Sequence, residues 1–107
     1  MAAIEKTLPA DLPAAQGHFP GNPIIPGAWL LADALASVAA AQGWDRARGG
    51  ACVVKSAKFL APCRPGDAVH VSYSESAGIL TLECTVGDTT VLSAKLSCPP
   101  SPPIPKA

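Results

Sequence analysis

An α+β fold, in which one helix lies against one face of an antiparallel sheet, is predicted by two patterns in the 107-residue sequence. Residues 28–42 are almost all apolar, are rich in Ala and Leu, and end at Gly43, as is typical of a helix. After residue 50, segments of alternating apolar and polar residues are typical of half-buried strands. One strand before the helix and four after it, joined by short turns, indicate an antiparallel sheet.

The individual elements follow from the same patterns. Residues 3–8, with apolar Ile4 and Leu8, predict a short edge strand. The helix over residues 28–42 is apolar all round, so we expect it to be buried. Four strands are predicted after it, over residues 51–60, 69–74, 80–86 and 92–98, with a tight turn at Gly87-Asp88 between the last two.

The bulk properties fit a single domain that associates with another subunit. A chain of this length has room for one domain, and a small domain enlarges its core by oligomerisation. Hydrophobic residues make up 49% of the chain and charged residues only 15%, which also favours a buried interface. We assign residues 1–98 to the domain. Residues 99–107 are rich in Pro and are predicted to form a disordered tail.

Charge and cysteine usage exclude several classes of protein. Eight basic and eight acidic residues cancel, so no overall basic field attracts nucleic acid or an anionic membrane. The four cysteines form no C-x-x-C pair and no His/Cys metal spacing, which favours reduced thiols and no metal site. The longest apolar stretch is too short for a bilayer, which takes about 20 residues. We expect a soluble, cytoplasmic protein.

Residues 17–27 read Gly-His-Phe-Pro-Gly-Asn-Pro-Ile-Ile-Pro-Gly and are the most informative stretch of the chain. Each proline fixes φ and removes an amide donor, and each glycine permits angles or close approaches that a side chain forbids. Pro26 and Gly27 fall where the helix begins, and the free amides there can hold a carbonyl or an anion. A titratable His18 near such a helix start predicts an acid–base site.

The loop and the apolar helix after it resemble the β-hydroxyacyl-acyl-carrier-protein dehydratases of fatty-acid and polyene synthesis. Residues 58–67, Lys-Phe-Leu-Ala-Pro-Cys-Arg-Pro-Gly-Asp, resemble the second recognisable stretch of that family. The resemblance implies a hotdog fold, an antiparallel five-stranded sheet wrapped around one central helix. It also implies dehydration of (3R)-3-hydroxyacyl thioesters to trans-2-enoyl thioesters on an acyl carrier protein, with no metal or other cofactor.

This reaction needs a base for the α-proton, a donor for the enolate-like oxygen and an acid for the leaving β-hydroxyl. His18 and the Gly27 amide match the family's residues for the first two roles. The family's carboxylate lies fourteen positions after the histidine, where this chain has Ala32. Asp33, the helix's only carboxylate, is displaced by one residue, a rotation of about 100°. Asp33 is therefore the candidate acid, and a helix edge that reaches solvent is the alternative.

We assign substrate binding to four further residues: Phe19, Pro26, Trp29 and Phe59. Phe59 is similar to an aromatic residue that lines the acyl tunnel of the resembled family, and Trp29 is expected to shape the same pocket. For Trp29 and Phe59, ordinary core packing is the alternative interpretation. The scattered basic residues, among them Lys55, Lys58 and Arg64, can meet an acidic carrier protein or lie on a solvated surface.

In the resembled family, the histidine and the acid of one site come from opposite protomers of a dimer. The chain is therefore expected to form a homodimer, or a heterodimer with a related hotdog subunit. If Asp33 cannot act as the acid, the alternative function is a non-catalytic or half-site subunit of a heterodimeric dehydratase that binds acyl carrier protein. The resemblance argues against a hotdog thioesterase.

Overall fold

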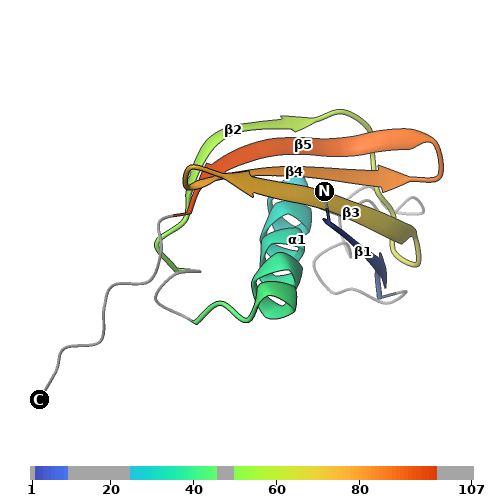
Figure 1. Ribbon diagram of the computed structural model, residues 1–107. Helices are drawn as coiled ribbons and strands as arrows, with labels where there is room; N and C mark the ends of the chain where they lie inside the picture. The colour runs from blue at the N-terminus through green and yellow to red at the C-terminus, as the bar shows by residue number, and fades with distance from the viewer. Residues whose placement is uncertain (1, 10–24, 46–49, 99–107) are drawn as a thin grey trace, which may run out of the picture.

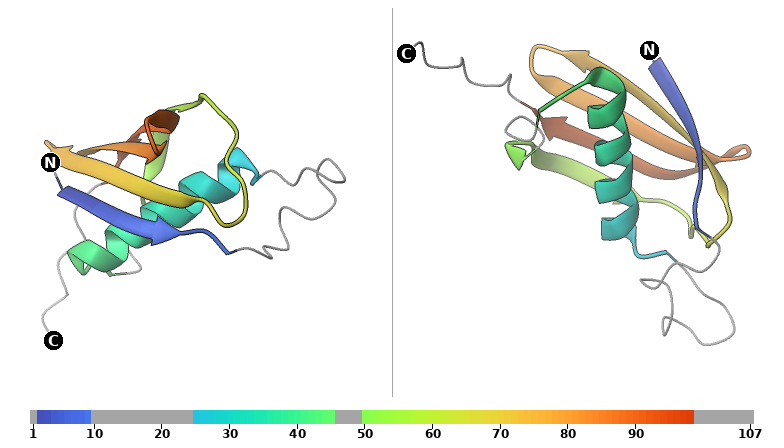
Figure 2. Two further views of the ribbon diagram at one scale, coloured as in Figure 1. Left: turned by 90° about the vertical axis from the view of Figure 1, so that its right-hand side faces the viewer. Right: turned by 90° about the horizontal axis from the view of Figure 1, so that it is seen from below.

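The computed structural model describes residues 2–9, 25–45 and 50–98, which form one sheet and one helix. The elements in chain order are β1 (Ala2–Thr7), α1 (Gly27–Gln42), β2 (Val53–Phe59), β3 (Ala68–Ser76), β4 (Ile79–Val86) and β5 (Thr89–Ser97). The five strands are antiparallel in the order β1-β3-β4-β5-β2, so β1 and β2 lie at opposite edges. The sheet curves over α1 (Figure 1), and two further views show the helix along one face only (Figure 2). The predicted hotdog architecture is confirmed.

The core lies between the concave face of the sheet and one side of α1. Alternate residues of the central strands face the helix, because successive side chains of a strand point to opposite faces. Leu30, Ala34 and Val38 complete this core from the helix, at the spacing of four that places residues on one helical face. The buried strand residues are Val69, Val71, Tyr73, Leu80, Leu82, Cys84, Val91, Leu92, Ala94 and Leu96.

Both ends of α1 lie within one residue of the predicted ends. At the C-terminus Gly43 adopts the left-handed conformation, φ 68°, and its amide donates to the Ala39 and Ala40 carbonyls. Glycine adopts these angles without the steric cost that a Cβ adds. At the N-terminus Pro26 precedes the helix without any side-chain cap, and the first turn holds no acidic residue. Among the described residues, no side chain therefore caps the first amides of α1.

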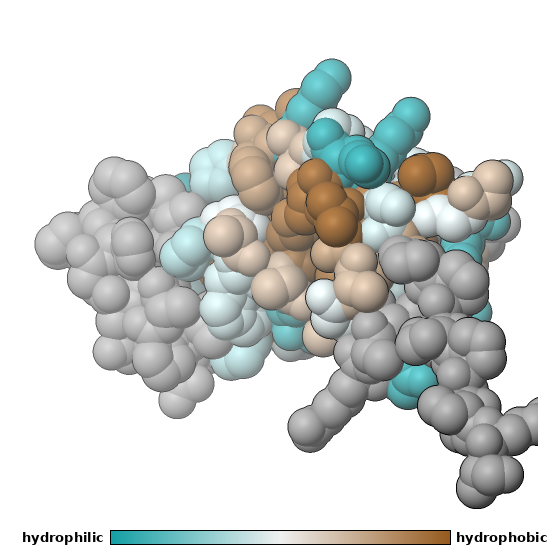
Figure 3. All heavy atoms as spheres, turned by 90° about the vertical axis from the view of Figure 1, so that its left-hand side faces the viewer, coloured by the Kyte–Doolittle hydropathy of each residue, from teal (hydrophilic) through white to brown (hydrophobic). Residues whose placement is uncertain are grey.

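The expectation that α1 is buried all round was wrong for the single chain. The sheet covers only one face of the helix, and Ala28, Ala32 and Ala36 on the other face are exposed. Strand β2 at the adjacent edge is also uncovered, with Val54 48% and Phe59 53% exposed. One side of the molecule shows apolar residues gathered at its centre, with hydrophilic side chains above them (Figure 3). No helix in the described part of the chain is long and apolar enough to cross a membrane.

Candidate active site at the start of the helix

The start of α1 is held in place by the connection between β2 and β3. The Ile25 amide donates to the Cys63 carbonyl at 2.7 Å, two residues before the helix begins. The end of β1 is tied to the same connection, because the Leu8 amide donates to Asp67 and the Leu8 carbonyl accepts from Gly66. Three segments far apart in sequence thus converge where the helix exposes its amides and the positive end of its dipole.

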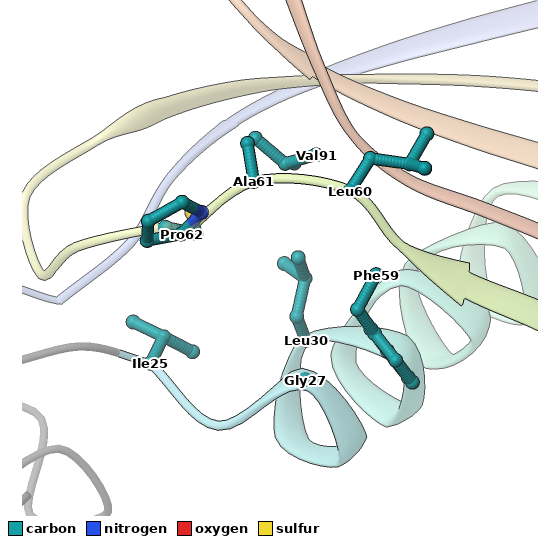
Figure 4. A pocket seen from close by; sticks show the side chains of 9 residues that line it. Ile25, Gly27, Leu30, Phe59, Leu60, Ala61, Pro62 and Val91 are labelled. Carbon is teal, nitrogen blue, oxygen red and sulfur yellow. The ribbon is translucent and has the colours of Figure 1, made fainter.

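An apolar cavity of about 330 Å³ lies beside this helix start (Figure 4). Its lining comes from the helix start, the end of β2 with the residues that follow, and β5. The lining residues are Ile25, Gly27, Leu30, Phe59, Leu60, Ala61, Pro62, Cys63 and Val91. A cavity of this size with backbone amides at its edge suits an acyl chain whose polar end meets the helix start.

Phe59 packs directly against Gly27. A Cβ added to Gly27 would lie 2.5 Å from a ring carbon of Phe59, so only glycine fits beneath the ring without displacing it. Phe59 also borders a second apolar cavity, of about 430 Å³, between the outer face of α1 and β2. The ring therefore lies at the boundary of the two spaces, immediately above the first residue of the helix.

Cys63 lines the first cavity but remains a thiol at neutral pH. Burial and the nearby Asp67 carboxylate raise its pKa to about 11. Burial, with smaller effects of Cys63 and two carboxylates, raises the pKa of the buried Cys84 to about 12. The thiolate is the nucleophilic form of cysteine, so neither residue is suited to covalent catalysis. In the described residues, no cluster of His, Cys, Asp and Glu is arranged to hold a metal ion.

Asp33 points to the edge of the sheet opposite β2. Its Oδ2 atom lies 2.5 Å from the Lys6 ammonium of β1, and the two side chains are only 23% and 27% exposed. The Lys6 ammonium also donates to the Ser37 hydroxyl at 3.0 Å, and that hydroxyl donates to the Asp33 carbonyl at 2.9 Å. The carboxylate is thus paired within its own chain and links α1 to β1.

Ala32, one residue earlier, faces the other side. It lines the cavity between α1 and β2, whereas Asp33 lines neither of the two cavities described above. The difference follows from helix geometry, since consecutive residues are rotated by about 100°. The position that the resemblance gives to the acid therefore holds a methyl group in the cavity that Phe59 also lines, and the carboxylate points toward β1 instead.

The structure brings together some of the predicted site residues and separates others. Gly27 and Phe59 meet at the first cavity, with Pro26 directly before them. Trp29 is half-buried against the core and lines neither cavity at the helix start. His18 and Phe19 lie outside the described residues.

Sequence reasoning did not identify Leu30 and the run 60–63 as cavity residues, or Lys6 as the partner of Asp33. The run 60–63 belongs to the second family-like stretch, so its position after Phe59 was an available signal. No comparable signal pointed to Lys6, because its contact with Asp33 depends on how the edge strand crosses the helix.

Comparison with known proteins places the chain in a family. A model of the ApeI-like family, described as ApeI dehydratase, matches residues 1–95, so the chain belongs to this family of dehydratases. It is 26% identical to a chain of the dehydratase heterocomplex ApeI:P from Xenorhabdus doucetiae, with a TM-score of 0.65 over 91% of this chain and 86% of that one. The F36A mutant of the fluoroacetyl-CoA-specific thioesterase FlK, 12% identical with a TM-score of 0.62 over 90% and 84%, shares the fold.

Curated relatives support the same family. The chain is 37% identical over 102 residues to the 3-hydroxyacyl-[acyl-carrier-protein] dehydratase FabZ of Alkaliphilus metalliredigens (strain QYMF), covering 86% of this chain and 69% of that protein. It is 38% identical over 74 residues to FabZ of Latilactobacillus sakei subsp. sakei (strain 23K), covering 65% of this chain and 53% of that protein. The chain thus spans between half and about two thirds of the length of these relatives. The predicted relationship to the acyl-carrier-protein dehydratases is confirmed.

The pairing of Asp33 with Lys6 predicts a structural role that stability measurements can detect. Asp33→Asn leaves a partly buried ammonium without its counter-charge, so we expect the free energy of unfolding to fall by about 1–3 kcal/mol. In a double-mutant cycle with Lys6→Met, the two losses should not add, because each removes the same ion pair. Urea unfolding measures all four proteins. Glu5→Gln, on the same strand but exposed, is the control, and an Asp33→Asn protein as stable as wild type would contradict the role.

Proposed function

We propose that this chain takes part in the dehydration of (3R)-3-hydroxyacyl thioesters to trans-2-enoyl thioesters on an acyl carrier protein, in fatty-acid or polyene synthesis. Membership of the dehydratase family supports the reaction class. The observation that carries the proposal is the helix start at Gly27, which has no side-chain cap among the described residues and lies beside an apolar cavity. This arrangement offers a hydrogen-bond donor to a thioester carbonyl and apolar space to the acyl chain.

In the proposed mechanism, the thioester carbonyl accepts a hydrogen bond from the Gly27 amide. His18 removes a proton from the α-carbon, and the electron pair of that C–H bond moves toward the carbonyl, whose oxygen gains negative charge. The helix amides and dipole stabilise this charge without rearranging. The electron pair then forms the double bond as the bond to the β-oxygen breaks, and an acid protonates the hydroxyl so that it leaves as water. Phe59, which lines the cavity, is assigned to binding the acyl chain, together with Phe19 and Pro26 of the segment before the helix. Trp29 lines neither cavity, so its alternative role in core packing is favoured.

The source of the acid distinguishes two hypotheses: the chain is a self-sufficient enzyme, or it is one subunit of a heterodimeric dehydratase. Asp33 is the candidate if the chain is a self-sufficient enzyme. Its contact with Lys6, and its position away from the cavity that Ala32 lines, favour the hypothesis that the acid comes from a partner subunit. We therefore propose that this chain supplies His18 and that a partner subunit supplies the carboxylate. The heterocomplex of the ApeI:P structure supports such an assembly for a related chain.

We propose that the two subunits join through β2 and the outer face of α1, with their sheets edge to edge. Within the described sheet, β2 is an edge strand with no strand beyond it, and Val53, Val54 and Phe59 on it are exposed. The groove between β2 and α1 is lined almost entirely by apolar side chains, from Ala28 to Leu35 on the helix side. Large exposed apolar areas on a small protein mark an interaction surface.

The base is tested by His18→Ala. We expect dehydration, or the reverse hydration of a crotonyl-carrier thioester, to fall by about 10²–10⁴ because proton transfer at the α-carbon loses its base. The measurement uses the assembly in which the wild-type chain is active, and thermal unfolding checks the fold. His70→Ala, which removes the other histidine of the chain, is the control and should retain activity. Activity of His18→Ala within a few-fold of wild type would exclude it as the base.

The origin of the acid is tested by comparing Asp33→Asn and Ala32→Glu with the wild-type chain. With a partner-supplied acid, the purified chain is nearly inactive in hydrating an enoyl-carrier thioester, and Asp33→Asn leaves the activity of the complete assembly within about three-fold, apart from the stability loss. Ala32→Glu then places a carboxylate in the groove, and any homodimer that the purified variant forms should be more active than the wild-type chain alone. A chain that is active alone and loses about 10²-fold or more in Asp33→Asn would identify Asp33 as the acid instead.

The interface is tested by Val54→Asp, which places a charge in the apolar groove. We expect at least about a ten-fold weaker association with any second subunit, because a buried unpaired carboxylate is costly. Sedimentation velocity at several concentrations measures the association. Ser74→Asp, at an exposed position on β3 and away from β2, is the matched control. Unchanged association of Val54→Asp would move the interface away from this edge.

A further inference from the structure

Positive charge is concentrated in one part of a chain that is neutral overall. Residues 46–66 contain no Asp or Glu, although the chain has eight acidic residues in total. The same segment holds five of the eight basic residues, which are Arg46, Arg48, Lys55, Lys58 and Arg64. Strand β2 lies within this segment, so the edge strand carries lysines and no carboxylate.

The β2 lysines have no ionic partner in the described part of the chain. Lys55 lies at the register shift between Val54 and Ser56, and both Lys55 and Lys58 are exposed. On the neighbouring strand β5, Lys58 lies opposite Ser93, and Ser56 lies opposite another lysine, Lys95. The nearest strand therefore adds positive charge instead of neutralising it.

At the opposite edge of the sheet, the charged side chains of β1 have ionic partners within the chain. On β1, Glu5 is paired with His70 of β3, and Lys6 is paired with Asp33 of α1. The charges of β1 are thus satisfied inside the chain, while those of β2 face outward beside exposed valines and Phe59. The unmatched charge coincides with the edge that is open to another strand.

Pairing of β2 with β2 of a second copy is electrostatically unfavourable. An antiparallel two-fold arrangement brings two copies of Lys55 and two of Lys58 onto one short strand pair, with no carboxylate from either side. Like charges across a strand pair are destabilising, and lysines on an edge strand are a common way to prevent self-pairing. The apolar groove attracts a partner, and the lysines disfavour an identical one.

We propose that β2 selects a non-identical hotdog subunit whose edge strand carries Asp or Glu opposite Lys55 and Lys58. This inference rests on the proposed function, in which β2 is the subunit interface. Opposite charges across the strand pair then stabilise the heterodimer and set its register, and the absence of acid on β2 suppresses the homodimer. Strand β2 therefore borders an apolar groove that binds a partner, and its lysines determine by charge which partner is preferred.

The proposed selection by charge is tested with the wild-type chain and a variant of it, without any other protein. The double variant Lys55→Glu/Lys58→Glu has an acidic edge strand and otherwise the same groove, so it serves as the complementary partner. Wild-type protein, labelled with ¹⁵N, is mixed with the unlabelled double variant, and native mass spectrometry counts the two homodimers and the mixed dimer. Circular dichroism and thermal unfolding check that both proteins are folded.

We expect the mixed dimer to exceed each homodimer by about ten-fold at about 20 mM salt. The excess should fall toward the statistical ratio near 1 M salt, where the screening length is about 3 Å. Lys95→Glu is the control, because it reverses a charge on β5, one strand in from the edge, and should not produce this excess with the wild-type chain.

Several outcomes would overturn the inference. They are a statistical mixture at low salt, a wild-type homodimer that is unaffected by salt, and no mixed dimer at all. Binding of a purified acyl carrier protein to the wild type but not to the double variant, without a mixed dimer, would assign the lysines to the carrier instead. A mixed dimer that persists when both chains also carry Val54→Asp would leave the charge effect intact and contradict the proposed interface. Native mass spectrometry of the mixed dimer and binding of the carrier protein do not depend on dehydratase activity. Failure of an activity assay would therefore count against the proposed function and not against this inference.

Discussion

The backbone hydrogen bonds around the connection between β2 and β3 are the constraint on which the site depends. They join Ile25, at the start of the helix, and Leu8, at the end of β1, to the same short segment. Because these bonds are between backbone groups, the position of Gly27 depends little on the side chains around it. The segment also closes one side of the cavity with Ala61, Pro62 and Cys63. Fold and site are therefore coupled through one loop that holds the first turn of the helix against the sheet.

The helix that begins there presents different chemistry on its different sides. Leu30, Ala34 and Val38 enter the core, Asp33 and Ser37 meet Lys6 at one edge of the sheet, and Ala32 faces the groove at the other edge. A displacement of one residue is small in sequence but large in space, since it rotates a side chain by about 100°. A carboxylate at position 32 would lie in the groove that Phe59 also lines, whereas the carboxylate of Asp33 pairs with Lys6 and links β1 to the helix.

The fold was predictable from the sequence because its signals are local. The alternation in β3, β4 and β5 indicates which residues face the core, and Gly43 supplies the left-handed residue that ends the helix. Gly27 and Phe59 were predictable as candidate site residues only through the family resemblance. The pairing of Lys6 with Asp33 was not predictable, because the crossing of β1 over the helix is a tertiary feature. The burial of α1 was overestimated, because an apolar helix indicates a buried face without indicating whether the same chain covers it.

The proposed assembly with a partner offers one explanation for three features: the uncovered face of α1, the open edge of β2 and the absence of a carboxylate at position 32. Each of them is a defect in an isolated domain: apolar surface in water, unpaired strand amides, and a site with no acid in the groove. They all lie on the same side of the sheet, whereas the charges of the opposite edge are paired internally. Stability of an isolated domain does not explain why the charges of one edge are paired while the other edge exposes both apolar side chains and lysines. In the proposed assembly, a second subunit covers the groove, pairs with β2 and brings carboxylates, so one partner would meet all these requirements and the helix start at Gly27 would be one half of a shared site.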